Sequence, residues 1–342
     1  MKLVPSISLI AFLSVVFGCS NSKTNTVTPT PAPTSGVSTY VGNGTPGLVN
    51  GTGTGAELSA PVGIVVDVLG NLYISEKGNN LIRKVAPGGV VTTLVGTGTA
   101  GYKDGPVATA QFNDPEGMVI DGTGNLFVAD AGNNVIRKIT PDGQVSTYAG
   151  NGKAGLINGS ATGAEFSTPK GLAIDKARNL YVADYGNNVI REISAIGTVT
   201  TYAGNGTPGL VNGSAASAEF QNPTGIAIDG SYEVFVAEAG NSDIREILQS
   251  GKVSTFVSGL PNPVWVTLDG AGNMYASCTN STIQFISATG KISTYAGSGT
   301  PSFTDGPLLL SGFNNPLGLI ADNLGEVIVC DNGNNRLRVV KP

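Results

Sequence analysis

Short apolar runs separated by polar, glycine-rich turns form a unit that the chain repeats. The unit reads Pro-x-Gly, three mostly apolar residues, Asp, a polar turn with Asn, and four mostly apolar residues before an acid. Its copies begin at Pro61, Pro115, Pro169, Pro223, Pro263 and Pro316. A nearly constant period of this length predicts stacked copies of one supersecondary structure.

Within one copy the pattern predicts four strands. In the second copy, residues 117–120 and 126–129 are short apolar runs on either side of a Gly-rich turn that starts with Asp121. Residues 135–139 and 145–149 follow after further turns, and the last run alternates as a half-buried strand does. Four antiparallel strands in each of six copies predict an all-β, six-bladed β-propeller.

The two ends of the repeat array complement each other. The sixth copy stops after its third strand, at residues 337–340, whereas residues 37–41 (VSTYV) precede the first copy and match residues 145–149 (VSTYA). We therefore expect residues 37–41 to complete the last blade and close the ring, which leaves no open sheet edge. The propeller domain is expected to span residues 36–342.

Three copies carry a family resemblance. Residues 71–76 (NLYISE) with 78–80 (GNN), 125–130 (NLFVAD) with 132–134, and 179–184 (NLYVAD) with 186–188 resemble NHL repeats. Copies four and six depart from the pattern, with Glu233 and Glu326 in the Asn position. The resemblance covers residues 36–342 and implies a six-bladed propeller that usually serves as an interaction platform. It implies no particular chemistry, because propellers include both binding proteins and enzymes.

Composition narrows the function classes. The net charge of −5 argues against nucleic-acid binding, because neutralising phosphates needs a basic surface. The sequence has no histidine, which removes Ser-His-Asp and Cys-His nucleophiles and His-ligated zinc. Cys278 and Cys330 occupy neighbouring columns of the aligned repeats, so we expect two buried thiols and no bridge between them.

The first residues read as an export signal. Lys2 precedes an apolar stretch at residues 7–17, which is too short to span a bilayer. Residues 1–18 are interpreted as a signal peptide whose end resembles a lipobox, with Cys19 as the lipidated first residue of the mature chain. Residues 19–35 are rich in Pro, Thr and Ser and are expected to form a tether. This predicts an exported protein of the cell envelope that meets a membrane only through its lipid anchor.

Long loops of equal length precede five of the six copies, and the loop before Pro263 is missing. We expect these loops and the turns after the second strands to form a rim on one face, where ligands bind. The loops share an Asn or Asp before Gly and an apolar anchor. The polar positions are the candidate binding residues: Asp104, Asn158, Asn212 and Asp305.

The fifth copy departs most from the pattern. Trp265, the only tryptophan, replaces a Gly found in the other copies, and Cys278 replaces an acid. We expect Trp265 near the mouth of the central channel, where it either stacks on a sugar or peptide or fills the space of the missing loop.

When the copies are aligned, two positions carry an acid in nearly every copy, and we call them the first and the second acid column. In the first copy they are Asp67 and Glu76. They are interpreted as turn caps, with axial calcium as the alternative. No residue is assigned as catalytic or metal-binding, and no cofactor other than calcium is considered. The sequence favours a non-catalytic protein that binds a protein, peptide or glycan. A propeller lactonase or lyase with a carboxylate-bound axial metal stays open, as does a purely structural surface module.

Overall fold

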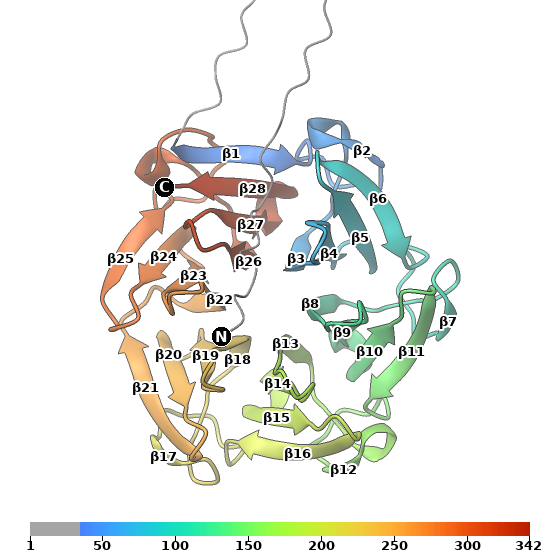
Figure 1. The fold of residues 1–342 in the computed structure, drawn as a ribbon, viewed down its shortest axis with the longest axis vertical. Helices are drawn as coiled ribbons and strands as arrows, with labels where there is room; N and C mark the ends of the chain where they lie inside the picture. The colour runs from blue at the N-terminus through green and yellow to red at the C-terminus, as the bar shows by residue number, and fades with distance from the viewer. Residues whose placement is uncertain (1–34) are drawn as a thin grey trace, which may run out of the picture.

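The computed structural model describes residues 35–342. The proposed signal peptide, Cys19 and nearly all of the tether lie outside these residues. Six small sheets surround a central axis, which confirms the six-bladed β-propeller (Figure 1). No helix in residues 35–342 is long and apolar enough to cross a membrane.

The blades are numbered one to six in chain order from the first repeat, and strands of the same position share a place in every blade. The inner strands line the axis: β3 (Pro61–Val66), β8 (Pro115–Ile120), β13 (Pro169–Ile174), β18 (Pro223–Ile228), β22 (Pro263–Leu268) and β26 (Pro316–Ala321). The second strands follow: β4 (Leu72–Glu76), β9 (Leu126–Asp130), β14 (Leu180–Asp184), β19 (Val234–Glu238), β23 (Met274–Cys278) and β27 (Val327–Asp331).

The third strands lie farther out: β5 (Leu81–Ala86), β10 (Val135–Ile139), β15 (Val189–Ile193), β20 (Asp243–Ile247), β24 (Thr282–Ile286) and β28 (Arg336–Lys341). The outer strands complete the blades: β6 (Val90–Val95), β11 (Gln144–Ala149), β16 (Thr198–Ala203), β21 (Lys252–Ser258), β25 (Ile292–Ala296) and β1 (Gly36–Val41). Neighbouring strands within each blade run antiparallel.

The N-terminal strand closes the ring as the sequence predicts. Strand β1 pairs with β28 in blade six, with Val37 opposite Val340 and Thr39 opposite Arg338. Blade six is therefore built from both ends of the propeller domain (Figure 1). The edge of β28 is covered, and the blade is held by hydrogen bonds between segments about 300 residues apart.

Four blades carry a fifth, two-residue strand that the sequence pattern did not indicate. These strands pair with the outer strand of their own blade and are β2 (Gly51–Thr52), β7 (Gly105–Pro106), β12 (Gly159–Ser160) and β17 (Gly213–Ser214). A single bridge between Gly306 and Val37 does the same in blade six. Short 3₁₀ turns complete the secondary structure: η1 (Gly53–Gly55), η2 (Ala131–Asn133), η3 (Ala161–Gly163), η4 (Tyr185–Asn187), η5 (Leu308–Leu310) and η6 (Asn332–Asn334).

The core lies between the blades. Five of the six hydrophobic clusters join two neighbouring blades, and the sixth joins blades five and six and also includes Val62 of blade one. The ring thus has a buried seam between each pair of blades. The free thiols of Cys278 and Cys330 are both buried in the described structure, as expected. Burial raises the pKa of Cys278 to about 12, which keeps that thiol protonated and unreactive.

The turns between first and second strands confirm the role of the first acid column. Asp121 accepts hydrogen bonds from the backbone N–H groups of Thr123 and Asn125, both at 2.9 Å. Partial burial acts to raise the pKa of Asp121, but the hydrogen bonds from Asn125 and Thr123 lower it to about 2. The carboxylate is therefore charged and serves the turn.

Candidate functional site

The loops between blades are fastened by a buried ion pair in each blade that has a long loop. These interblade loops comprise residues 42–60, 96–114, 150–168, 204–222 and 297–315. In blade three, Arg191 donates to Asp184 at 2.9 Å, and both side chains are fully buried. The same pair recurs in the other four blades: Glu76 with Arg83, Asp130 with Arg137, Glu238 with Arg245, and Asp331 with Arg338.

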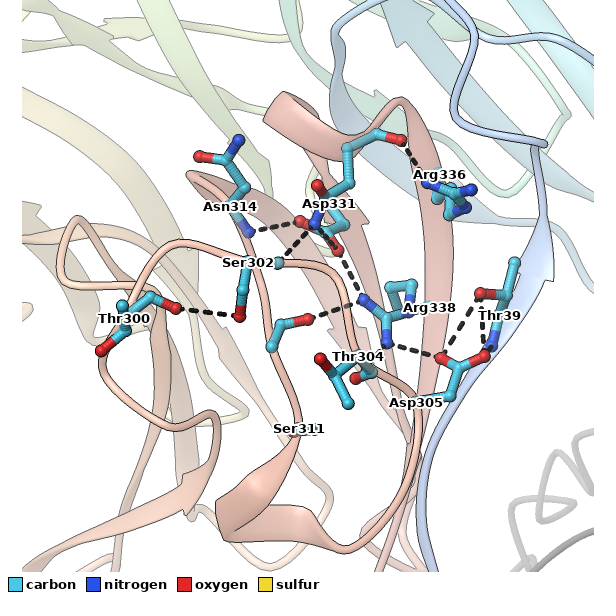
Figure 2. A network of polar contacts seen from close by, with 12 residues as sticks. Thr39, Thr300, Ser302, Thr304, Asp305, Ser311, Asn314, Asp331, Arg336 and Arg338 are labelled. Carbon is cyan, nitrogen blue, oxygen red and sulfur yellow. Dashed lines mark hydrogen bonds and ion pairs between the residues drawn. The ribbon is translucent and has the colours of Figure 1, made fainter.

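The arginine of each pair reaches the loop. Arg191 donates to the backbone oxygens of Glu165 at 2.7 Å and of Ile157 at 2.9 Å, and to the side-chain oxygen of Asn158 at 2.8 Å. Its guanidinium lies over the ring of Phe166, the buried apolar anchor of the loop, at 5.0 Å. We call this unit of acid, arginine and bound loop oxygens the loop clamp. Figure 2 shows the loop clamp of blade six, where Arg338 lies between Asp331 and Asp305.

The predicted rim residues are part of these clamps. Asp104, Asn158, Asn212 and Asp305 each accept a hydrogen bond from the arginine of their own blade. They lie on four different blades and do not meet at one point. Asp104 and Asp305 remain 46% and 43% exposed, so one side of each carboxylate still faces solvent. Their use in ligand binding stays a prediction, whereas their role in holding the loops is visible.

The interpretation of the second acid column as turn caps was wrong, because in the described structure Asp130, Asp184 and Asp331 accept no hydrogen bond from the backbone of the turn that each begins. These carboxylates hold the preceding loop instead. Asp184 also accepts hydrogen bonds from the backbone of Ser167 in the loop and from the amide of Asn187. Burial raises the pKa of Asp184 to about 6, opposed by these hydrogen bonds and by Arg191. The carboxylate thus exchanges hydration for fixed donors that position the loop.

Blade five lacks the loop and the clamp together. Gln284 stands in the place of the arginine and Cys278 in the place of the acid. The connection from β21 to β22 is only residues 259–262. In the described structure the pair is thus absent where the loop is absent, which links the pair to the loop.

The clamped loops expose apolar side chains at matching positions. We call these residues the apolar rim; they are between 42% and 51% exposed and comprise Leu48, Val49, Tyr102, Leu156, Ile157, Leu210, Val211 and Phe303. The carbonyl groups of Val49, Ile157 and Val211 accept hydrogen bonds from the clamp arginines. The backbone beneath the exposed side chains is therefore fixed.

The turns after the second strands lie on the same face as the apolar rim. Asn187 in one such turn donates to the backbone oxygen of Gly155, next to Leu156, at 2.7 Å. Asn79, Asn133, Asn241 and Asn334 make the equivalent hydrogen bond in their blades. The expectation that loops and turns form one face is thus met by direct contacts.

A cavity of about 250 Å³ opens at the axis within this face. Trp265 lines it, as its expected place near the channel mouth requires, but the side chain is only 8% exposed. It packs in a hydrophobic cluster with Val62 of blade one and Leu319 of blade six. Little of the indole is open for stacking, and the side chain occupies space between neighbouring blades.

The polar residues of this cavity were not among the predicted site residues: Lys77, Glu116, Lys170, Thr224, Asn315 and Asn332. Three of them directly follow the Pro-x-Gly proline of their copy, where the other blades have Val62, Val264 and Leu317. A comparison of the six copies at this position would have shown that three of them carry a polar residue where the other three carry an apolar one. What the sequence alone lacked was the direction of these side chains toward the axis.

Carboxylates do not assemble as the calcium alternative requires. Among residues 35–342, no three His, Cys, Asp or Glu side chains gather in a way that could hold a metal ion. The axial cavity instead holds Glu116 beside Lys77, with the two charged groups 3.4 Å apart. Burial raises the pKa of Glu116, while Lys170 and Lys77 oppose that rise. These residues do not fit an axial calcium ion.

The fold and this face define the chain as a six-bladed β-propeller with clamped loops. Solved structures of the same fold include an auxiliary nutrient binding protein from Bacteroides ovatus, with a TM-score of 0.66 and 16% identity, covering 90% of this chain and 76% of that one. A virginiamycin B lyase from Staphylococcus aureus has a TM-score of 0.55 and 15% identity, covering 83% and 95%. Identities this low show the fold alone.

The sequence family described as NHL repeat matches residues 313–340. The chain is 29% identical to NHL repeat-containing protein 2 of Bos taurus, covering 82% of this chain and 46% of that protein. It is 35% identical over 139 residues to Protein SUPPRESSOR OF QUENCHING 1, chloroplastic, of Arabidopsis thaliana, covering 39% of this chain and 12% of that protein. The chain thus spans less than half the length of these relatives. Together these matches support the similarity of the chain to the NHL-repeat β-propeller family.

Proposed function

We propose that the chain is a non-catalytic binding protein of the cell envelope, exported and attached to a membrane through a lipid on Cys19. It presents the face of the apolar rim to a protein, peptide or glycan. The observation that carries this proposal is the apolar rim itself, repeated on five loops and fixed by a buried clamp under each. Exposed apolar side chains on a rigid scaffold are typical of binding surfaces.

Rigidity supports a binding role. A loop that is ordered before the partner arrives loses little conformational entropy on binding, so more of the contact energy appears as affinity. The clamps achieve that order with hydrogen bonds from fully buried arginines. A chain selected only to fold has no need of apolar side chains at the tips of its clamped loops.

The catalytic alternative has weaker support. Lyases and gluconolactonases share the fold, but their likeness to this chain is below 25% identity. The axial cavity offers two lysines and one buried carboxylate, and the carboxylate cluster that a metal-dependent lactonase would need is not formed by residues 35–342. A thermal shift with calcium that is lost on removing Glu116 would favour the enzyme over the binder.

Blade three provides a matched test of the binding face. Ile157 belongs to the apolar rim and is 51% exposed, whereas Ile196 lies in the turn from β15 to β16 and is 91% exposed. Purified full-length chain, with Ile157→Ser or Ile196→Ser, is used to capture partners from the cell envelope. The proposal expects a partner that Ile157→Ser loses and Ile196→Ser retains. Equal capture by both variants contradicts it.

Membrane attachment is tested separately. Cys19→Ser should move the protein from the membrane fraction to the soluble fraction and abolish incorporation of labelled fatty acid. Unchanged membrane association of Cys19→Ser would refute the lipid anchor without touching the binding face.

A further inference from the structure

One position of the repeat is polar on one side of the axial cavity and apolar on the other, although the surrounding repeats are alike. This position is the residue after the inner-strand proline in each blade, and we call the two sides the polar half and the apolar half. That residue is polar in blades two, three and four: Glu116, Lys170 and Thr224. It is apolar in blades five, six and one: Val264, Leu317 and Val62. A scaffold position would not need this split, since all six strands meet the axis in the same way.

In the polar half, one of the two lysines forms no ion pair within the described residues, although its charge acts on the nearby Glu116 and opposes the rise that burial gives to the pKa of that carboxyl. The ammonium of Lys77 forms ion pairs with the carboxylates of Asp114, at 2.8 Å, and Glu116, at 3.4 Å. Lys170 has no carboxylate within 4.0 Å in residues 35–342, and its ammonium lies 4.1 Å from the ring centre of Tyr185. A cation held over an aromatic ring at a cavity wall is placed to receive an anion.

The polar half also offers hydrogen-bond acceptors. The hydroxyl of Thr224 donates to the backbone oxygen of Ala237 at 3.2 Å, which leaves its oxygen free to accept. Thr224 is 4% exposed and Glu116 is 6% exposed, so both are buried polar groups at the cavity wall. A ligand that presents one anionic group and one N–H donor would match this wall.

On the other side, Val62, Val264 and Leu317 face the cavity together with Trp265, and two amides of blade six, Asn315 and Asn332, also line it. Asn315 donates to Asn332 at 3.2 Å and Asn332 donates to the backbone oxygen of Pro61 at 3.1 Å, so these amides are hydrogen-bonded within the protein. The cavity of about 250 Å³ is smaller than sites for whole ligands, which typically measure about 300–1,000 Å³. Its size suits one residue-sized group of a larger partner or a very small molecule.

We propose that the axial cavity binds an apolar amino acid whose α-carboxylate is free and whose nitrogen is acylated. The carboxylate pairs with Lys170, the amide N–H is accepted by Thr224, and the side chain packs against Leu317, Val264 and Trp265. This chemistry occurs at the carboxyl end of a peptide and in a free N-acyl amino acid. The proposal rests on the binding role of the same face and names the group of the partner that the face recognises.

The protein carries its own reporter, because Trp265 is the only tryptophan and lines the cavity. Full-length protein is titrated with N-acetyl-leucine, with N-acetyl-leucinamide, and with a pentapeptide ending in leucine in its free-acid and amidated forms. Tryptophan fluorescence should change and saturate with the free acids and not with the amides. A stronger response to the peptide acid identifies a peptide end, and an equal response identifies the small acid.

Lys170→Gln should weaken binding of the acid forms about tenfold or more, because a charge-assisted contact becomes a neutral one. Lys153→Gln is the control, since Lys153 is an exposed lysine in the loop of the same blade. Thermal unfolding of both variants verifies that they remain folded. The proposal is overturned by equal response to acids and amides, by wild-type affinity of Lys170→Gln, or by no response at millimolar concentration.

These outcomes are separable from those of the binding face. Loss of partner capture by Ile157→Ser together with unaltered capture by Lys170→Gln would leave the proposed function intact and remove the axial site. Binding of the free acids in the fluorescence titration, with no partner captured, would support the axial site and contradict the proposed binding face.

Discussion

Asp243 is the residue at which blade four departs from its neighbours. It is 1% exposed and occupies a position that holds Val135 in blade two and Val189 in blade three. One of its carboxylate oxygens is buried without a hydrogen-bond partner in the described structure. The next loop, which covers this position elsewhere, is the one that blade five lacks.

Replacement of Asp243 by Val should therefore stabilise the protein at neutral pH. Burial raises the pKa of Asp243 from 3.8 to about 6, against the opposing effect of Arg245. The folded state then binds more protons than the unfolded state between these values, so this residue lowers stability increasingly as pH rises from about 4 to about 6. The expected gain for Asp243→Val is about 1–3 kcal/mol at pH 7 and much less at pH 4.

Urea unfolding of both proteins at pH 4, 5, 6 and 7 measures this effect. Asp142→Val, which removes an exposed acid from a turn of blade two, should show no such pH-dependent gain. A gain for Asp243→Val that is constant across pH would show that the charge of the carboxylate is not the cause.

At the scale of the element, the loop clamp combines a buried ion pair with a buried apolar anchor. A buried ion pair is weak evidence for stability by itself, because removing two charges from water opposes their attraction. Here the arginine also donates hydrogen bonds to three oxygens of the loop. The pair therefore holds the loop together with its buried apolar residues Ala164 and Phe166.

Breaking one clamp should cost more than removing it whole. Arg191→Gln leaves the carboxylate of Asp184 buried and uncompensated, and the expected loss is about 3–5 kcal/mol. The double variant Asp184→Cys, Arg191→Gln reproduces the residues of blade five, Cys278 and Gln284, and should recover at least about 1 kcal/mol. Loss of stability in the double variant equal to the sum of the two single losses would contradict the coupling.

At the scale of the whole molecule, repetition made the fold predictable. The six copies predicted six blades, and the pattern within one copy predicted four strands in each. The closure was predictable because the last copy lacks a fourth strand and residues 37–41 supply a matching one. The loop clamps were not predictable in that way, since their arginines bind backbone oxygens about 34 residues away that carry no sequence signal. The axial cavity was predictable in part. The sequence shows that Glu116, Lys170 and Thr224 occupy the same position of three copies, but only the structure shows that their side chains all face the axis.

Closure of the ring should control the stability of the whole molecule. Val37 is fully buried, pairs with Val340, and belongs to the same hydrophobic cluster as Trp265. Val37→Asp places a charge in that cluster and detaches β1, so the last blade loses its outer strand. The neighbouring Ser38 is partly exposed, and Ser38→Asp provides the control within the same strand.

We expect Val37→Asp to lower the free energy of unfolding by several kcal/mol, because an unpaired buried charge adds to the loss of a strand. Tryptophan emission should shift toward the red as Trp265 becomes hydrated, and the exposed edge of β28 should promote self-association in size-exclusion chromatography. Ser38→Asp should change none of these readouts appreciably. Wild-type stability and emission in Val37→Asp would show that the six blades hold together without the strand that joins their ends.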